Sequence, residues 1–190
     1  PISQTSSTIN YKDTLLYRNH YLLPSIKYVW DNTSWESWYP NDGSRMYLKY
    51  RLSSDKINEN LSFQTLTMDS RYYRPLFNHI SFAGRIFAGS SWGEHARKFW
   101  LGGTPWLFSS DKLRYNEPND SVENDVFLSE YVTPIRGYQI ASKYGHNALL
   151  CNLELRLPFL IYYFPSIKFL GQINGVIFAD IGVAWDDEFP

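Results

Sequence analysis

The sequence predicts an all-β protein built from antiparallel strands. In several stretches apolar and polar residues alternate with a period of two, and Asn, Asp, Gly and Pro mark the ends of these stretches. No long stretch has the period of an amphipathic helix. Aromatic residues are also unusually common, with 15 Tyr, 12 Phe and 7 Trp among 190 residues. So many rings require a large surface against which to pack.

Six strands are predicted from this alternation. They lie near residues 20–31, 43–53, 60–74, 78–91, 147–158 and 170–185. One connection, residues 92–146, is far longer than the others and contains glycines and prolines that interrupt regular structure. We therefore predict a long loop there, and a loop of this length in a compact domain usually has a function.

The first four predicted strands separate their two faces to different degrees. Strand 20–31 ends in the aromatic residues Tyr28 and Trp30. Strand 43–53 alternates between two sets, Met46, Leu48, Tyr50 and Leu52 against Arg45, Lys49 and Arg51. Strand 78–91 does the same with Ile80, Phe82 and Ile86 against Ser81 and Arg85. Strand 60–74 does not keep its phase, which predicts either a bulge or an end placed incorrectly.

The last two predicted strands each carry one acidic residue among apolar ones. In strand 147–158 one face holds Leu149, Cys151, Leu153, Leu155 and Leu157, and the other holds Leu150, Asn152, Glu154 and Arg156. In strand 170–185 one face holds Ile173, Gly175, Ile177, Ala179, Ile181, Val183 and Trp185, and the other holds Gln172, Asn174, Val176, Phe178 and Asp180. Glu154 and Asp180 therefore both lie on the more polar face.

Two architectures fit this alternation. A soluble β-sandwich or ligand-binding barrel would bury the apolar face as its core, whereas a membrane β-barrel would turn that face to lipid. Strands of about 10 to 12 residues are long for a sandwich but suit a tilted crossing of a bilayer. Aromatic residues gather near strand ends, at Trp30, Tyr72, Trp92 and Trp185 among others, as in the girdles of outer-membrane barrels. These two observations favour an antiparallel transmembrane β-barrel.

Composition argues against several other classes of protein. The formal net charge is −1 and Lys and Arg are scattered, so no nucleic-acid partner is expected. No run of about 18 apolar residues predicts a transmembrane helix. The single cysteine, Cys151, excludes an internal disulfide.

No catalytic site, metal or cofactor is predicted either. Residues 89–93 fit the G-x-S-x-G pattern of hydrolases, but that pattern requires a strand followed by a helix, and here a strand enters a loop. The four histidines are dispersed without the spacing of zinc ligands. The acidic residues 186–188 are explained by a solvated turn after the last strand.

One arginine in the long loop is a candidate partner for the two isolated acids. A lone carboxylate within such a strand is costly unless a positive group meets it. Arg136 in the loop sequence Ile135 to Tyr138 is the natural candidate to contact Glu154 and Asp180. A guanidinium pairs with a carboxylate through two hydrogen bonds, a planar match that Lys cannot make. The alternative is that Arg136 is solvated and both acids face water.

Several motifs resemble the bacterial surface antigen family, the superfamily of outer-membrane barrels for protein assembly and secretion. These are the segments 28–32 and 40–45, the loop motif 133–138, the strand 152–158 and the strand 178–185. The order and spacing of the motifs also match, from about residue 20 to residue 187. The chain looks closest to members in which the barrel follows a TolB-like β-propeller.

The resemblance implies a fold and a role for the loop motif. It implies a barrel of about 16 strands, of which residues 1–190 would form a partial barrel domain of about six consecutive strands, a fragment of a longer protein. In the family the long loop folds into the barrel lumen, and its arginine contacts acids on the two following strands. Arg136, Glu154 and Asp180 would then form a structural latch, with Gly137 allowing a tight turn and Tyr138 packing its ring beside the wall.

The resemblance also implies a function, location and partners. We expect a non-enzymatic barrel in the bacterial outer membrane that inserts or translocates proteins. Its expected partners are outer-membrane lipid, substrate outer-membrane or secreted proteins, and a propeller or other periplasmic domain upstream. Two alternatives stay open, namely a passive membrane anchor or pore for an attached propeller domain and a soluble β-sheet binding module.

Overall fold

The structure is a computed structural model that describes residues 22–36, 39–57, 61–77, 80–103, 129–132, 134–139, 141–157 and 175–186. Six strands of seven residues or more form most of the structure. They are β1 (Ser25–Asp31), β3 (Tyr39–Ser53), β4 (Phe63–Phe77), β5 (Ile80–Trp92), β9 (Asn147–Leu157) and β10 (Gly175–Trp185). Four strands of three residues are β2 (Ser34–Glu36), β6 (Phe99–Leu101), β7 (Glu130–Val132) and β8 (Lys143–Gly145).

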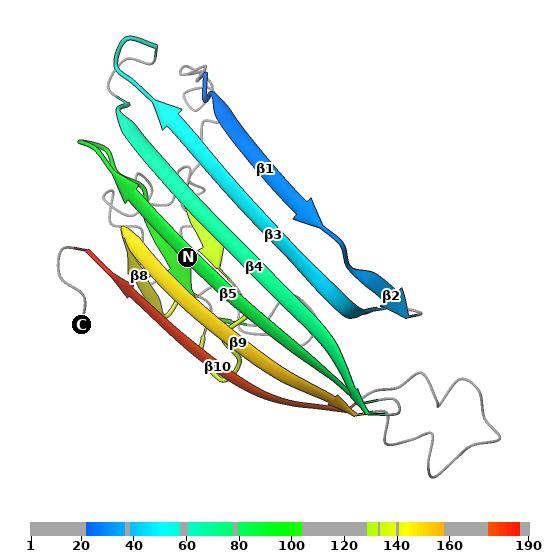
Figure 1. Cartoon of the computed structure of the whole chain (residues 1–190). Helices are drawn as coiled ribbons and strands as arrows, with labels where there is room; N and C mark the ends of the chain where they lie inside the picture. The colour runs from blue at the N-terminus through cyan, green and yellow to red at the C-terminus, as the bar shows by residue number, and fades with distance from the viewer. Residues whose placement is uncertain are drawn as a thin grey trace, which may run out of the picture.

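The main sheet is antiparallel throughout. Its strand order is β1-β3-β4-β5-β9-β10, and β2 pairs with the beginning of β3. Figure 1 shows these strands side by side with a common tilt in one curved layer. Within the described residues β1 and β10 are the two edges, so the sheet is open, and we call it the wall. No helix in these residues is long and apolar enough to span a membrane.

A second, smaller sheet lies within the segment predicted as a loop. It has the order β7-β6-β8, with β6 parallel to β7 and antiparallel to β8. Both β6 and β8 contact β10, and β6 also contacts β9, so this sheet lies over one face of the main sheet (Figure 1). The predicted long loop 92–146 therefore contains three short strands, which the sequence does not reveal because three-residue strands are too short to show an alternation.

Of the two alternatives predicted for strand 60–74, a bulge or an end placed incorrectly, β4 shows the second. The pairing of β4 with β5 is continuous from Gln64 to Pro75, and the register shifts only between Pro75 and Phe77. The sequence lost its phase because Phe63 and Tyr73 lie on the polar face and polar residues such as Ser70 lie on the apolar face. The strand also begins later than predicted, at Phe63.

Three other predicted strands start or end differently, and one of them is β3, which begins at Tyr39 and not at residue 43. Residues 22–24 precede β1 without strand structure, and β1 begins at Ser25. The predicted residues 20–21 and 170–174 lie outside the described residues, and β10 is described from Gly175. The loop begins one residue later than predicted, because Trp92 is the last residue of β5.

The pairing register gives the main sheet two chemically different faces. We call the face that bears Asp69, Arg85, Asn152 and Asp180 the inner face, and the opposite one the outer face. The outer face is largely apolar, with exposed side chains that include Ile26, Tyr28, Trp30, Leu48, Leu66, Tyr72, Ile86, Trp92, Leu149, Leu153, Ile177 and Ile181. The two charged residues at its described strand positions are Asp42 and Arg74.

The inner face is charged in the middle and apolar where the small sheet covers it. Its charged residues are Lys27, Asp31, Arg45, Lys49, Arg51, Asp69, Arg71, Arg85, Glu154, Arg156 and Asp180. The buried apolar cluster joins wall and loop residues, namely Phe87, Phe99, Leu101, Val132, Ile135, Ala148 and Leu150. Within it the rings of Phe87 and Phe99 meet edge to face, with centroids 6.0 Å apart. Burial of this cluster holds the small sheet against the wall.

Candidate functional site

The loop motif forms a tight turn tied to the start of the long connection. Ile135 and Gly103 form an isolated antiparallel bridge, in which the Ile135 amide donates to the Gly103 carbonyl at 3.0 Å. The Gly103 amide donates in turn to the Tyr138 carbonyl at 3.2 Å. Gly137 has a φ of 87°, a backbone conformation that glycine adopts without strain. These bonds present Arg136 at the apex of the turn, above β9 and β10.

Arg136 binds Asp180 through its side chain and its backbone. Its Nε donates to Asp180 Oδ2 at 2.7 Å and its Nη2 donates to Oδ1 at 2.7 Å. Its backbone amide donates to Oδ2 at 2.9 Å. The two side-chain bonds form the parallel fork that a guanidinium makes with a carboxylate. The backbone bond adds a constraint on the loop itself, because it depends on where the main chain runs.

Glu154 and Phe178 complete the surroundings of the Arg136 guanidinium. Nη1 of Arg136 donates to Glu154 Oε1 at 2.8 Å. The other oxygen of Glu154 accepts from Arg156 Nη2 at 3.0 Å, so this carboxylate joins two arginines. The Arg136 Cζ atom also lies 3.7 Å from the ring centroid of Phe178, a distance typical of cation–π contact. Nothing in the sequence argument had assigned Phe178 this role.

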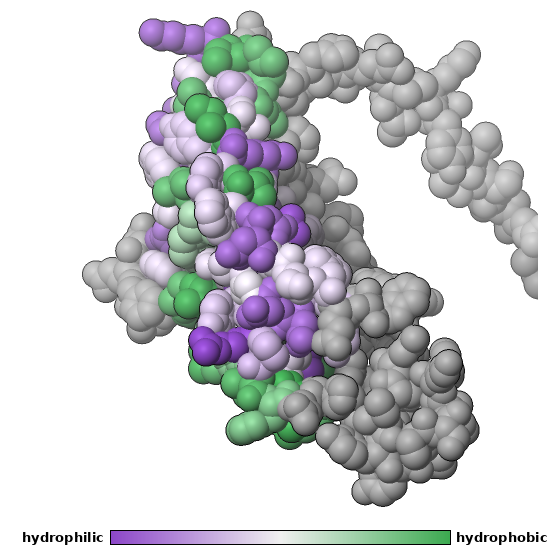
Figure 2. Space-filling view, turned by 45° about the vertical axis from the view of Figure 1, so that its right-hand side comes forward, coloured by the Kyte–Doolittle hydropathy of each residue, from purple (hydrophilic) through white to green (hydrophobic). Residues whose placement is uncertain are grey.

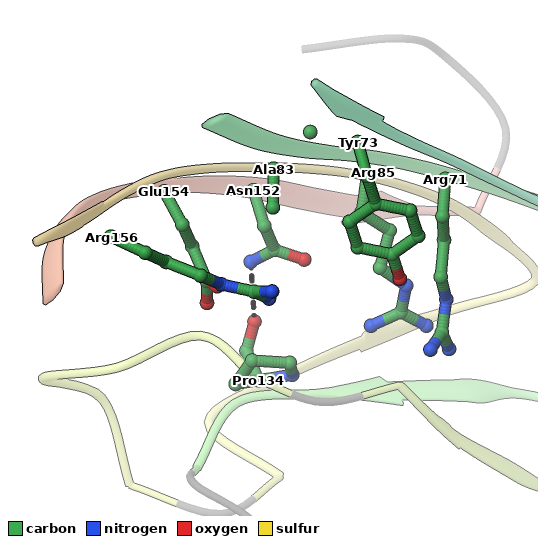
Figure 3. A pocket seen from close by; sticks show the side chains of 9 residues that line it. Arg71, Tyr73, Ala83, Arg85, Pro134, Asn152, Glu154 and Arg156 are labelled. Atoms are coloured by element: carbon green, nitrogen blue, oxygen red, sulfur yellow. Dashed lines mark hydrogen bonds and ion pairs between the residues drawn. The ribbon is translucent and has the colours of Figure 1, made fainter. Parts of the chain in front are cut away.

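Asn152 links the loop to the wall beside this ion pair. Its Nδ2 group donates to the Pro134 carbonyl and to Asp180 Oδ1, both at 2.8 Å (Figure 3). The Asn152 amide therefore holds Pro134 of the loop in place and also orients the Asp180 carboxylate that Arg136 binds. The alternation of residues along the strand placed Asn152 on the inner face, but its contact with Pro134 depends on the path of the loop and could not be predicted from the sequence.

Burial makes these interactions strong. The side chain of Asp180 is 2% exposed and that of Arg136 is 17% exposed. In such surroundings an unpaired charge would be costly, and the hydrogen bonds to the carboxylates replace the lost water. The bonds with Asp180 and the charge of Glu154 hold the pKa of Arg136 above its ordinary value despite burial. Arg136 is a permanent cation, so its contacts do not depend on pH near neutrality.

Two residues of the motif occupy positions that the sequence did not suggest. Tyr138, whose ring was expected to pack beside the wall, is 56% exposed. Ile135 packs there instead, buried in the apolar cluster and facing Gly182 of β10. A Cβ atom at position 182 would clash with the Ile135 side chain, so the loop approaches the wall where the wall has no side chain. In the sequence, the apolar residue next to Arg136 and the glycine in the last strand were the features that could have predicted this contact.

Glu130 forms a second tether that the sequence analysis missed. Its Oε1 atom lies 3.3 Å from Lys49 Nζ and 3.5 Å from Arg51 Nη2. Both cations lie on β3, which β4 and β5 separate from β9. The long loop is therefore attached to the inner face at two places, to β9 and β10 through Arg136 and to β3 through Glu130. No local pattern marks such a contact, because its partners lie about 80 residues apart.

The serine considered as a nucleophile is held by hydrogen bonds that stabilise the strand and the loop. The Ser91 hydroxyl is buried, accepts from the Arg97 amide at 2.8 Å and lies 3.3 Å from the Thr65 hydroxyl. Ser91 lies within β5, one residue before the strand ends and the loop begins, without the strand-to-helix turn that exposes a nucleophile. Among the described residues no three His, Cys, Asp or Glu side chains are grouped as metal ligands.

Comparison with known proteins identifies the family. The profile of the Omp85 superfamily domain matches residues 3–190, nearly the whole chain. A search of the curated proteins found no match. Proteins of this superfamily are bacterial outer-membrane proteins that insert or translocate other proteins. The antiparallel sheet with one apolar and one charged face is the corresponding part of a barrel wall, and the chain belongs to the Omp85 superfamily.

Proposed function

We propose that this chain forms part of the wall of a non-enzymatic outer-membrane barrel that inserts or translocates proteins, with its long loop latched to the inner face. The observation that carries the proposal is the chemical division of the main sheet. A broad exposed apolar surface is rare on a soluble monomer and marks contact with lipid or another protein. In an outer-membrane barrel that surface faces lipid, and the charged inner face lines an aqueous lumen.

The arrangement of side chains in space supports this orientation. Figure 2 shows a group of hydrophilic residues in the middle of the visible face and hydrophobic residues at its lower end, with both kinds mixed in the upper part. Charged residues on the outer face of the described strands are limited to Asp42 and Arg74, which lie near the end that carries the turn after residue 77. A charge at the bilayer centre would cost about 2 to 4 kcal/mol, whereas a charge near the interface costs little.

The latch gives the loop a defined place in this function. Arg136, Asp180, Glu154 and Asn152 hold the turn 134–138 against the wall, and Gly137 gives the turn its shape. A loop fixed inside the barrel partly fills the lumen and stiffens the strands to which it is bound. We therefore assign Arg136 and Asp180 a structural role in keeping the barrel competent for transport, without any chemical step.

Depletion of the full-length protein in its native host tests the transport role. We expect the amounts of other outer-membrane or secreted proteins to fall, as measured by quantitative proteomics of outer-membrane and secreted fractions. Restoring expression of the wild-type gene should reverse the loss. If every other outer-membrane and secreted protein is retained, the transport role is wrong and the protein serves as an anchor or pore.

Extraction of membranes with carbonate tests the location separately. The full-length protein should stay in the membrane during a carbonate wash and be released by detergent, because the apolar outer face requires a lipid or detergent environment. Release by carbonate alone would show that the outer face is covered by protein, and it would exclude both the transport and the anchor interpretations.

A further inference from the structure

The outer face carries its two charged residues at one place, where the pairing of β3 with β4 ends. The last pair of this ladder is Gly43 opposite Tyr73, and Asp42 and Arg74 are the next residues on each strand. Both residues are exposed, on neighbouring strands and on the same face. An acid and a base therefore lie next to each other at the margin of a surface that is largely apolar.

Arg74 and Tyr72 bring hydrogen-bond donors to the same point of the outer face. The Nη1 group of Arg74 donates to the Tyr72 hydroxyl at 3.3 Å. A tyrosine hydroxyl that accepts a hydrogen bond keeps its own proton to donate, and a guanidinium carries its N–H groups in a fixed fork. Arg74 is exposed and Tyr72 is 46% exposed, so these donors are accessible to a ligand. The charged oxygens of a phosphate are acceptors that match such a planar group.

Asp42 supplies an acceptor of opposite charge beside these donors. Within the described residues no ion pair joins the Asp42 carboxylate to Arg74. The two charges therefore do not neutralise each other by direct contact. A carboxylate favours a cation that donates hydrogen bonds, and a primary ammonium group has three N–H donors. The ligand that fits both residues thus carries a phosphate and an ammonium group close together.

Apolar residues continue this row across the outer face, and we call them the apolar strip. They are Phe82 of β5 opposite Arg74, Leu155 of β9 opposite Phe82, and Ile177 of β10 opposite Leu155. Ile177 is 63% exposed. Covering such side chains with hydrocarbon removes apolar surface from water and is favourable. A ligand with a charged end and a hydrocarbon end therefore matches the order of the side chains along this row.

We propose that Asp42, Tyr72 and Arg74 bind the headgroup of a zwitterionic phospholipid that carries a primary ammonium group, as phosphatidylethanolamine does. The phosphate oxygens accept hydrogen bonds from Arg74 and Tyr72, the ammonium group donates to Asp42, and the acyl chains lie along the apolar strip. A phosphatidylcholine headgroup has no N–H donor for Asp42, and a phosphatidylglycerol headgroup brings no positive charge. The inference rests on the membrane location in the proposed function, because the outer face must be in contact with lipid to meet this headgroup.

Native mass spectrometry of the full-length protein in detergent micelles tests the proposal. Phosphatidylethanolamine, phosphatidylcholine and phosphatidylglycerol with the same acyl chains are added at equal concentrations, and the lipid that stays bound is counted. Phosphatidylethanolamine should be retained about tenfold more strongly than either of the others, because each of them lacks the charge-assisted hydrogen bond to Asp42. Equal retention of the three lipids by a protein that withstands the carbonate wash would overturn the headgroup site and leave the membrane location intact. Release by carbonate would overturn both.

Three variants locate the site, with circular dichroism to show that the sheet is retained in each. Asp42→Asn should remove the preference for phosphatidylethanolamine over the other two lipids, because the ammonium group loses its charged partner. Arg74→Gln should lower the retention of all three lipids about tenfold, since all of them carry the phosphate. Arg45→Gln is the matched control, because Arg45 is 47% exposed on β3 but lies on the inner face, and retention should not change. An unchanged preference in Asp42→Asn, or equal losses in Arg74→Gln and Arg45→Gln, would contradict the site.

Discussion

Arg136 holds Asp180 with three hydrogen bonds, two from its guanidinium and one from its own backbone amide. The side-chain bonds attach a charge to the wall, and the backbone bond attaches the main chain of the loop to the same carboxylate. Because Asp180 is almost fully buried, its charge is stable only while the loop is in place. The position of the loop and the stability of β10 are therefore linked through one side chain.

Replacing Arg136 should destabilise the folded barrel. Arg136→Ala leaves Asp180 without its main partner and removes one of the two arginines that bind Glu154, and breaking a buried pair of this kind costs about 3 to 5 kcal/mol. Arg136→Lys should recover only part of this loss, because an ammonium cannot form the planar fork. Unfolding of the full-length protein by denaturant in detergent measures both effects. Arg74→Ala on the outer face is the control, and an equal loss in that variant would show that the effect is not due to the latch.

The two acids should differ in importance. Asp180→Asn should destabilise the protein more than Glu154→Gln, because Asp180 is 2% exposed and accepts from Arg136 and Asn152, whereas Glu154 is 21% exposed. The same unfolding experiment gives the ranking. A larger loss in Glu154→Gln would mean that the link between Arg136 and Arg156 matters more than the fork.

A charge exchange tests direct contact between loop and wall. Arg136→Glu and Asp180→Arg should each destabilise the protein strongly, and the double variant should recover part of the loss because opposite charges meet again. The coupling free energy between the two sites should be about 0.5 to 3 kcal/mol, as for other residues in contact. Strictly additive effects in this cycle would show that the two groups do not interact in the folded protein.

The close approach at Gly182 predicts a compensating pair. Gly182→Ala should displace the loop, since the added Cβ atom would clash with the Ile135 side chain. Ile135→Val removes the terminal methyl group and should partly relieve Gly182→Ala, although by itself it costs about 0.5 to 1.5 kcal/mol. Gly137→Ala is an instructive comparison, because nothing lies within 4 Å of an added Cβ and the expected cost comes from φ alone. Limited proteolysis of the loop measures its displacement in each variant.

The contacts of Glu130 with β3 should contribute less to the stability of the protein than the contacts of Arg136. Glu130→Gln weakens the contacts with Lys49 and Arg51 at 3.3 and 3.5 Å, which are longer than those of Arg136. We expect a modest loss of stability together with faster proteolysis near β7. The pair Glu130→Lys and Lys49→Glu should restore protection if the two side chains meet. Protection that is unchanged in Glu130→Lys alone would remove Glu130 from the attachments of the loop.

Much of the main sheet follows from local rules in the chain. A strand turns successive side chains to opposite faces, so the positions of Glu154 and Asp180 on the same face as Arg45 and Arg85 follow from counting residues. The same rule failed to show the regularity of β4, where an aromatic residue at each end lies on the polar face. Patterns of this kind report the face of a residue and say nothing about its partner.

The sequence by itself determined the all-β class, the two faces of the wall strands and the residues that would require a charged partner. Tertiary structure alone decided the three-residue strands of the loop, the contact of Glu130 with β3, the burial of Ile135 against Gly182 and the contact of Asn152 with Pro134. The physical reason is the range of the interactions. Alternation is set within a few residues by backbone geometry, whereas these contacts join residues from about 18 to 81 positions apart and depend on the path of the loop.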